Sequence, residues 1–119
     1  MTKLQNVILI SSDFAGAERF YAEGLGLSIK FRDGSKWMQM KAGSANVAFA
    51  SPSEGPKTAS GATPVFEVED IDACLSRLVS MGATVVERRD MATHGRTASA
   101  RDPDGNLLQI FQRSPVQDV

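Results

Sequence analysis

The sequence has very little cysteine and histidine and no long apolar run. Its 119 residues include one cysteine, Cys74, and one histidine, His94. A single cysteine excludes a disulfide within the chain and fits a reducing compartment, so we expect a cytoplasmic location. No apolar run approaches the roughly 18 residues of a membrane helix, and no signal-peptide pattern is present, so we expect no membrane partner.

An excess of charge of one sign is also lacking. Lys and Arg total 13 against 14 for Asp and Glu, which gives a formal net charge of -1 at pH 7. A nucleic-acid partner would require a concentrated positive field, so we expect none. The chain has no nucleotide-binding glycine loop, no Ser/His/Asp signature and no Cys-x-x-Cys pair. What remains informative is the pattern of its apolar residues and turns.

In the first half, short apolar runs alternate with turn residues. The run Leu4–Ile10 is rich in β-branched residues and alternates in part, which predicts a strand. Asp13 is a candidate helix cap and Gly24 a stop signal, so we predict a helix over Phe14–Glu23. Three further runs joined by short turns predict antiparallel strands over Leu27–Phe31, Trp37–Lys41 and Asn46–Ala50.

The second half repeats this plan after a linker at about 52–62 that is rich in Pro, Gly and Ser. Asp70 is a candidate cap 57 residues after Asp13, and the helical stripe that begins at Ile71 ends at Gly82. The predicted strands are Thr63–Val68, Ala83–Glu87, Thr97–Ala100 and Leu107–Phe111.

These patterns predict an α+β fold of two βαβββ modules within a single domain. Repeat one spans about 1–51, repeat two about 63–113, and a C-terminal tail covers 114–119. In each module a helix covers one face of a curved, mixed sheet, and the other face needs a partner. We expect the two open faces to turn toward each other and to enclose a cleft for function.

The last predicted hairpin places one polar residue on an apolar face. Pro103 presets φ at the second position of the turn 102–105, and Gly105 can take the positive φ that a tight reversal needs. After the turn, period-2 alternation separates two sets of side chains. Leu107, Gln109 and Phe111 share one face, while Leu108 and Ile110 share the other.

Four short motifs stand in a characteristic order around the two repeats: Ser12-Asp13, Phe20-Tyr21, Leu25-Gly26-Leu27 and Asp102-Pro103-Asp104-Gly105-Asn106. Their order resembles the vicinal-oxygen-chelate superfamily, which groups glyoxalase I, extradiol dioxygenases, fosfomycin-modifying enzymes and bleomycin-resistance binding proteins. The resemblance covers nearly the whole chain and implies the two-module fold, but it implies no single activity.

Metal-dependent members of that superfamily carry His, Glu or Gln on the first and last strand of each half. The resemblance places Asn6, Phe49, Thr63 and Gln109 at these positions. Phe cannot ligate a metal, and Thr and Asn are poor ligands for first-row metals. We therefore expect no metal and no cofactor, and a divalent metal enters only under the alternative of a degenerate or displaced site.

The candidate ligand-binding residues are these four positions and side chains near them. Gln109 is either a hydrogen-bonding contact to a ligand or a polar residue satisfied by Asn6 or Thr63 across the cleft. The aromatic side chains form either a box that stacks on a planar ligand or plain core filling. The full set is Asn6, Phe31, Trp37, Phe49, Thr63, Glu67, Gln109 and Phe111.

His94 and Glu67 are the two candidates for catalysis. His94 is either a general base at neutral pH or a residue at the rim of a loop. Glu67 alternates into the cleft, where it either binds a cationic ligand or pairs with Arg96 or Arg101. Cys74 lies on the apolar stripe of the second helix and is interpreted as a core residue.

Three functions stay open on this evidence. The metal-poor set favours a small-molecule binding protein of the bleomycin-resistance type, which sequesters an aromatic or apolar ligand unchanged. The alternative is a divergent glyoxalase-like lyase or isomerase, or a dioxygenase. A third interpretation is a dimerising module of a larger system. Because the superfamily commonly forms homodimers, we expect a homodimer, packed side by side or with exchanged halves.

Overall fold

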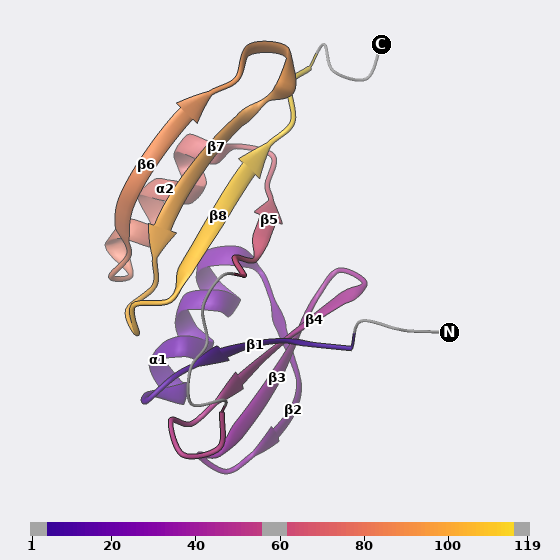
Figure 1. Ribbon diagram of the computed structural model, residues 1–119, viewed down its shortest axis with the longest axis vertical. Coiled ribbons are helices and arrows are strands. Elements are labelled where there is room, and N and C mark those ends of the chain that lie inside the picture. Colours follow the sequence, from indigo (N-terminus) through magenta and orange to yellow (C-terminus); the bar gives the residue numbers. More distant parts are fainter. Residues whose placement is uncertain (1–4, 56–61, 116–119) are drawn as a thin grey trace. The chain divides into compact units, whose positions relative to one another are not determined.

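The computed structural model describes residues 5–55 and 62–115 of the chain (Figure 1). The chain divides into two compact units, Met1–Gly61 and Ala62–Val119. The first residues of the predicted linker form a turn in which the N–H groups of Glu54 and Gly55 donate to the Ser51 carbonyl at 3.0 Å. The rest of the linker, Leu4 and the end of the predicted tail lie outside the described residues.

The first unit is a four-stranded mixed sheet with helices packed on one face (Figure 1). The strand order is β1-β4-β3-β2, with β1 parallel to β4 and the other neighbours antiparallel. Its elements are β1 (Val7–Ile10), α1 (Phe14–Arg19), the π-helical turn η1 (Phe20–Gly24), β2 (Ser28–Asp33), β3 (Trp37–Ala42) and β4 (Ala45–Ala50).

The second unit has the same topology, with the strand order β5-β8-β7-β6 and β5 parallel to β8. Helix α2 lies along one face of its sheet (Figure 1). The two βαβββ modules predicted from the sequence are therefore confirmed. The elements are β5 (Val65–Glu67), α2 (Ile71–Ser80), β6 (Thr84–Asp90), the 3₁₀ turn η2 (Ala92–His94), β7 (Arg96–Arg101) and β8 (Leu107–Gln112).

The first helix of each module begins at the predicted aspartate. Asp13 Oδ1 accepts a hydrogen bond from the Gly16 N–H at 3.1 Å, and Asp70 Oδ1 accepts one from the Ala73 N–H at 3.1 Å. Each cap satisfies an N–H that has no partner in the first helical turn, which is worth about 1 kcal/mol. The spacing of the two aspartates in the sequence thus marks the same structural position in each module.

Two boundaries differ from the sequence prediction for identifiable reasons. Strand β5 covers three residues instead of the predicted Thr63–Val68. Pro64 has no N–H to give to the ladder, so regular pairing starts after it, although its carbonyl accepts from Gln109 N–H at 2.9 Å. The predicted helix over Phe14–Glu23 is confirmed in position, but its last turn widens into η1, which no sequence signal indicated.

The second strand of each module carries a register shift at an equivalent place. The pairing of β2 with β3 shifts between Ile29 and Phe31, and that of β6 with β7 shifts between Val85 and Glu87. A bulge adds one residue to one strand and changes the face on which the next side chains lie. Because Ile29 lies opposite Met40 and Phe31 lies opposite its neighbour Gln39, the two apolar side chains of β2 are on different faces.

The core of the first unit lies between its sheet and its helices. Phe49 of β4 is 0% exposed, and its ring lies 4.8 Å from that of Tyr21 in η1, centroid to centroid. Tyr21 in turn meets Phe20 in an edge-on contact at 5.0 Å. Leu9 and Met38, the cross-strand neighbours of Phe49, share this face and are buried with it.

The core of the second unit repeats this arrangement with aliphatic residues. Helix α2 buries Ile71, Cys74, Leu75 and Leu78, and β8 contributes Leu108 and Ile110 from the facing side of the sheet. Cys74 is 0% exposed, which confirms its interpretation as a core residue. Burial raises the pKa of the Cys74 thiol, so the reactive thiolate is disfavoured at neutral pH.

The hairpin between β7 and β8 is held by one buried carboxylate. Asp102 is 4% exposed, and its Oδ1 accepts from the N–H groups of Asp104 at 2.9 Å and Asn106 at 2.8 Å. Its Oδ2 accepts from Asn106 Nδ2 at 3.1 Å. Gly105 adopts a φ of 88°, the positive value that the turn chemistry predicted. Among the described residues, no helix is long and apolar enough to span a membrane.

Candidate functional site

In each unit the sheet face that its own helix does not cover is called the open face. The open face of the first unit carries three of the predicted ligand-binding residues, Asn6, Phe31 and Trp37, together with Ile8. Phe31 of β2 is 55% exposed, Trp37 of β3 is half-buried, and Ile8 of β1 is 37% exposed. Phe31 lies opposite Gln39, and Trp37 lies opposite Asp33, so the two rings are diagonal neighbours on adjacent strands. Asn6 precedes β1 and alternates onto this face with Ile8.

The prediction that Phe49 lines the ligand site is wrong. Its side chain is on the helix-covered face, where it packs on Tyr21. The residues of β4 that lie on the open face are its neighbours Ala48 and Ala50, which pair with Ile8 and Ile10 of β1. The aromatic group predicted from the sequence is therefore reduced to Phe31 and Trp37 in this unit.

The open face of the second unit carries the other predicted positions. Gln109 and Phe111 are half-buried on β8, opposite Val65 and Glu67 of β5. The alternation predicted for β8 is confirmed, since Leu108 and Ile110 are fully buried on the other face. Thr63 is exposed and lies before β5. The half-buried amide of Gln109 can both donate and accept a hydrogen bond, and so can the hydroxyls of Ser99 and Thr97, which lie opposite Gln109 and Phe111 on β7.

Gly95 fixes the position of the Phe111 ring on this face. Gly95 is buried with φ 93°, and a Cβ built on it would lie 2.5 Å from the Gln112 carbonyl oxygen and 2.8 Å from Phe111 Cε1. Only glycine allows the loop before β7 to approach the end of β8 so closely. The loop therefore supports one edge of the open face.

Glu67 forms an ion pair, but not with the partner that the sequence suggested. Its two carboxylate oxygens accept from Arg113 Nε and Nη2, each at 3.4 Å, with both side chains about half exposed. Of the two suggested partners, Arg96 binds Asp72 and Gln112, while Arg101 donates to the Gly105 carbonyl at 3.0 Å. Glu67 is thus part of a surface ion pair, whose contribution to stability is at most about 1 kcal/mol.

His94 ends the 3₁₀ turn η2 between β6 and β7 and is exposed. Its backbone N–H donates to the Met91 carbonyl at 3.0 Å. Within the part of the chain that the structure describes, no contact brings its imidazole to Glu67, whose partner is Arg113. The two candidates for catalysis therefore do not form an acid–base pair within their unit.

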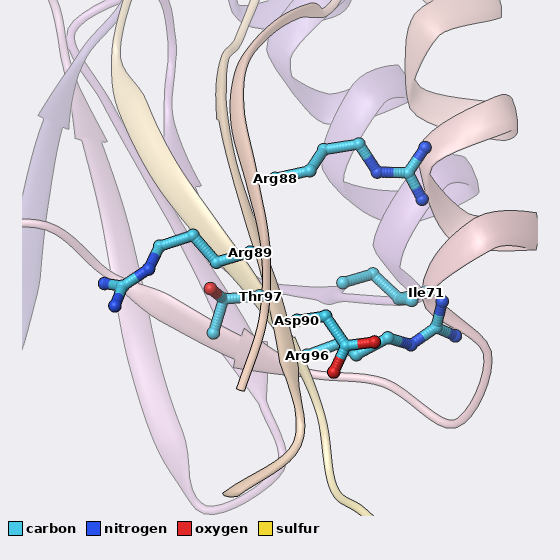
Figure 2. Close-up of a pocket in the computed structure, with 6 residues that line it drawn as sticks. All are labelled: Ile71, Arg88, Arg89, Asp90, Arg96 and Thr97. Carbon is cyan, nitrogen blue, oxygen red and sulfur yellow. The ribbon is translucent and has the colours of Figure 1, made fainter. Parts of the chain in front are cut away.

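A pocket that the sequence did not predict lies at the start of α2, beside β6 and β7 (Figure 2). It has a volume of about 280 Å³. Figure 2 shows Arg88 and Arg89 extending to opposite sides of β6, with only Arg88 directed toward α2. The lining residues are Ile71, Arg88, Arg89, Asp90, Arg96 and Thr97.

The arginines of this pocket are held by the protein itself. Asp72 accepts from Arg88 through Oδ1 and from Arg96 Nη1 through Oδ2, the latter at 3.3 Å. Gln112 Oε1 accepts from Arg96 Nη2 at 3.1 Å and from the Ile71 N–H at 2.8 Å. The hydrogen bond from Arg88, with further contributions from Arg96, lowers the pKa of Asp72. The network secures the N-terminus of α2 to the sheet.

The comparison of the sequence with protein-family models decides the family. The model of the Glyoxalase/Bleomycin resistance protein/Dioxygenase superfamily matches residues 3–110. The chain belongs to this superfamily. Within the superfamily, the solved structures that it resembles include TnmS3, an antibiotic binding protein from Streptomyces sp. CB03234, at 26% identity and a TM-score of 0.70. The match covers 96% of this chain and 98% of that chain.

Two further similar proteins match nearly the whole chain. A bleomycin resistance determinant encoded on the transposon Tn5 is 26% identical with a TM-score of 0.66, and the match covers 95% of this chain and 99% of that chain. An uncharacterized protein of Mycolicibacterium smegmatis is 27% identical over 115 residues, which are 97% of this chain and 96% of the relative.

The residues that carried the superfamily resemblance have structural roles. Asp13 caps α1, Phe20 and Tyr21 fill the core of the first unit, and Asp102 holds the β7–β8 hairpin. None of them lies on an open face. This explains why the motifs identify the fold and leave the chemistry of the ligand site undetermined.

The superfamily's metal-ligand positions do not fit a divalent cation in this chain. They hold the amides of Asn6 and Gln109, the hydroxyl of Thr63, and in β4 either the core residue Phe49 or the methyl group of Ala48 on the open face. Imidazole and carboxylate ligands, which first-row metals prefer, are missing from this set. Across residues 5–55 and 62–115, no three His, Cys, Asp or Glu side chains gather in one place.

Proposed function

We propose that this protein binds an aromatic or otherwise apolar small molecule, without a metal and without changing it chemically. The observation that carries the proposal is the chemistry of the side chains at the superfamily's metal-ligand positions in this chain. Amides, a hydroxyl and apolar groups stand where a metal-dependent relative needs imidazole or carboxylate. Such a surface can enclose a ligand by apolar contact and orient it by a few hydrogen bonds.

The composition of the open faces supports this proposal. Phe31 exposes more than half of its surface, and Ile8 and Val65 are 37% and 57% exposed. These side chains lie on different strands and sheets, and each offers exposed apolar surface that an apolar ligand can cover. The 26% identity to an antibiotic binding protein and to a bleomycin resistance determinant supports the same class of ligand.

The contact with Phe31 is testable with bleomycin as the probe and Trp37, the only tryptophan, as the fluorescent reporter on the same face. We expect wild-type protein to bind bleomycin and Phe31→Ala to bind it about 5- to 30-fold more weakly, because the variant loses about 1–2 kcal/mol of aromatic contact. The free energy of unfolding should fall by less than about 1 kcal/mol, because the side chain is already mostly exposed.

Ile29→Ala is the matched control for this experiment. Ile29 is 43% exposed and lies in the same strand, but it is on the other face of the sheet. We expect its affinity for bleomycin to stay within about twofold of wild type. Equal affinities of Phe31→Ala and wild type would contradict the proposed contact, and so would equal losses in Phe31→Ala and Ile29→Ala.

The other expectations drawn from the sequence stay predictions. These are a homodimer, a cytoplasmic location and the absence of a nucleic-acid partner. The alternative of a glyoxalase-like lyase or isomerase, or a dioxygenase, requires a displaced metal site or a reaction without metal. No described group of side chains favours it over binding.

A further inference from the structure

One polar atom on the open face of the first unit has no partner. Asn6 Oδ1 is buried, and within the described residues it accepts no hydrogen bond. More than nine in ten buried polar groups in proteins are paired, and an unpaired one costs about 1–3 kcal/mol. Such an atom is therefore a feature that requires an explanation.

The neighbouring strand does not supply the missing donor. Val7 of β1 lies opposite Val47 of β4, so Asn6 lies opposite Asn46 when the pairing is continued by one residue. One N–H of the Asn46 amide donates to the Gln5 carbonyl at 3.3 Å, and the other makes no hydrogen bond to Asn6 Oδ1. The side chain that follows Asn6 on the same face is Ile8, which has no donor. Neither neighbour therefore supplies the donor.

We propose that Asn6 selects ligands that carry an N–H or O–H donor. The inference rests on the proposed function, because it assigns to the ligand the donor that the protein does not provide. A ligand that lies beside Ile8 and donates to Asn6 Oδ1 would remove the cost of the unpaired oxygen. A planar ligand without a donor would leave that cost in place, so the site discriminates between the two.

Two planar probes that differ by one N–H test this selection. We expect wild-type protein to bind 2-quinolone about tenfold more tightly than N-methyl-2-quinolone in isothermal titration calorimetry, a ratio that corresponds to about 1.4 kcal/mol. Asn6→Leu keeps the branching at Cγ and removes the amide. It should reduce the preference to less than about twofold, mainly by weakening the binding of 2-quinolone.

The melting temperature without ligand gives an independent result. Because Asn6→Leu replaces an unpaired buried oxygen by a methyl group, we expect Tm to rise by about 3–5 °C. Asn46→Leu is the control on the opposite residue. It removes a paired amide, so its Tm should fall while the preference for 2-quinolone is retained.

The outcomes separate this inference from the proposed function. Equal affinity of wild type for both probes would overturn the role of Asn6, while binding itself would support the proposed function. A lower Tm of Asn6→Leu would also overturn the inference, because it would show that the amide has a partner. Failure of wild type to bind either probe would contradict both the inference and the proposed binding of planar compounds.

Discussion

Replacement of Phe49 by alanine is expected to lower the free energy of unfolding by about 3–5 kcal/mol, the cost of removing a large aromatic side chain from a core. Phe49 is fully buried and contacts Tyr21, which is also fully buried. The cavity left by the ring would be surrounded by rigid neighbours on β1 and β3, so little of it can close. The effect should appear in urea or thermal unfolding of the ligand-free protein.

Phe31→Ala is the natural comparison, because it deletes the same ring from the other face of the same sheet. We expect Phe31→Ala to lower the free energy of unfolding by less than about 1 kcal/mol and to weaken ligand binding instead. If the sequence prediction had been right and Phe49 lined the ligand site, the two variants would behave alike. A loss of stability below about 1 kcal/mol in Phe49→Ala would contradict the observed packing.

Replacement of Asp102 by alanine is expected to lower the free energy of unfolding by about 2–4 kcal/mol. The carboxylate is buried and accepts three hydrogen bonds in the β7–β8 hairpin, two of them from backbone N–H groups. Hydrogen bonds to a charged group are worth about 1.5–3 kcal/mol each, and removing the acceptor leaves buried donors unpaired. The three contributions do not add fully because they share one side chain.

Asp102→Asn separates the backbone contacts from the rest. Asparagine keeps one oxygen for the N–H groups of Asp104 and Asn106 but places an amide nitrogen against Asn106 Nδ2. We therefore expect a smaller loss, about half that of Asp102→Ala. Chemical denaturation of the three proteins measures both values. Wild-type stability in Asp102→Ala would show that the carboxylate does not hold the hairpin.

The fold could be predicted from the sequence because its signals are local. Asp13 and Asp70 are followed by amphipathic stripes, and the turn 102–105 has residues suited to its backbone. Each signal depends on a few neighbouring residues whose conformational preferences agree. Duplication strengthened the prediction, because each strand and α-helix of one module has a counterpart in the other.

The face on which Phe49 lies was not predicted, because the four buried residues of β4 are all apolar. Val47, Ala48, Phe49 and Ala50 are all buried. The signal that could have identified the face is Asn46, which by alternation shares its face with Ala48 and Ala50 and not with Phe49. Gln109 on β8 was placed correctly because a polar residue stands among apolar ones and identifies its face.

Contacts between distant residues also gave no signal in the sequence. Asp72 binds Arg88 and Arg96, which are 16 and 24 residues away in the chain. The ion pair of Glu67 with Arg113, in place of Arg96 or Arg101, was missed for the same reason. Arg113 follows β8, and β8 lies beside β5 only in the folded sheet. The bulge before Phe31 likewise depends on pairing that no local pattern specifies.

Binding of metal-free bleomycin before and after dialysis against EDTA tests the central claim most directly. The account predicts the same dissociation constant from Trp37 fluorescence in both preparations, and recovery of bleomycin with its mass unchanged. Binding that is lost after EDTA and restored by Zn²⁺, Mn²⁺, Ni²⁺ or Fe²⁺, or recovery of a converted product, would contradict it.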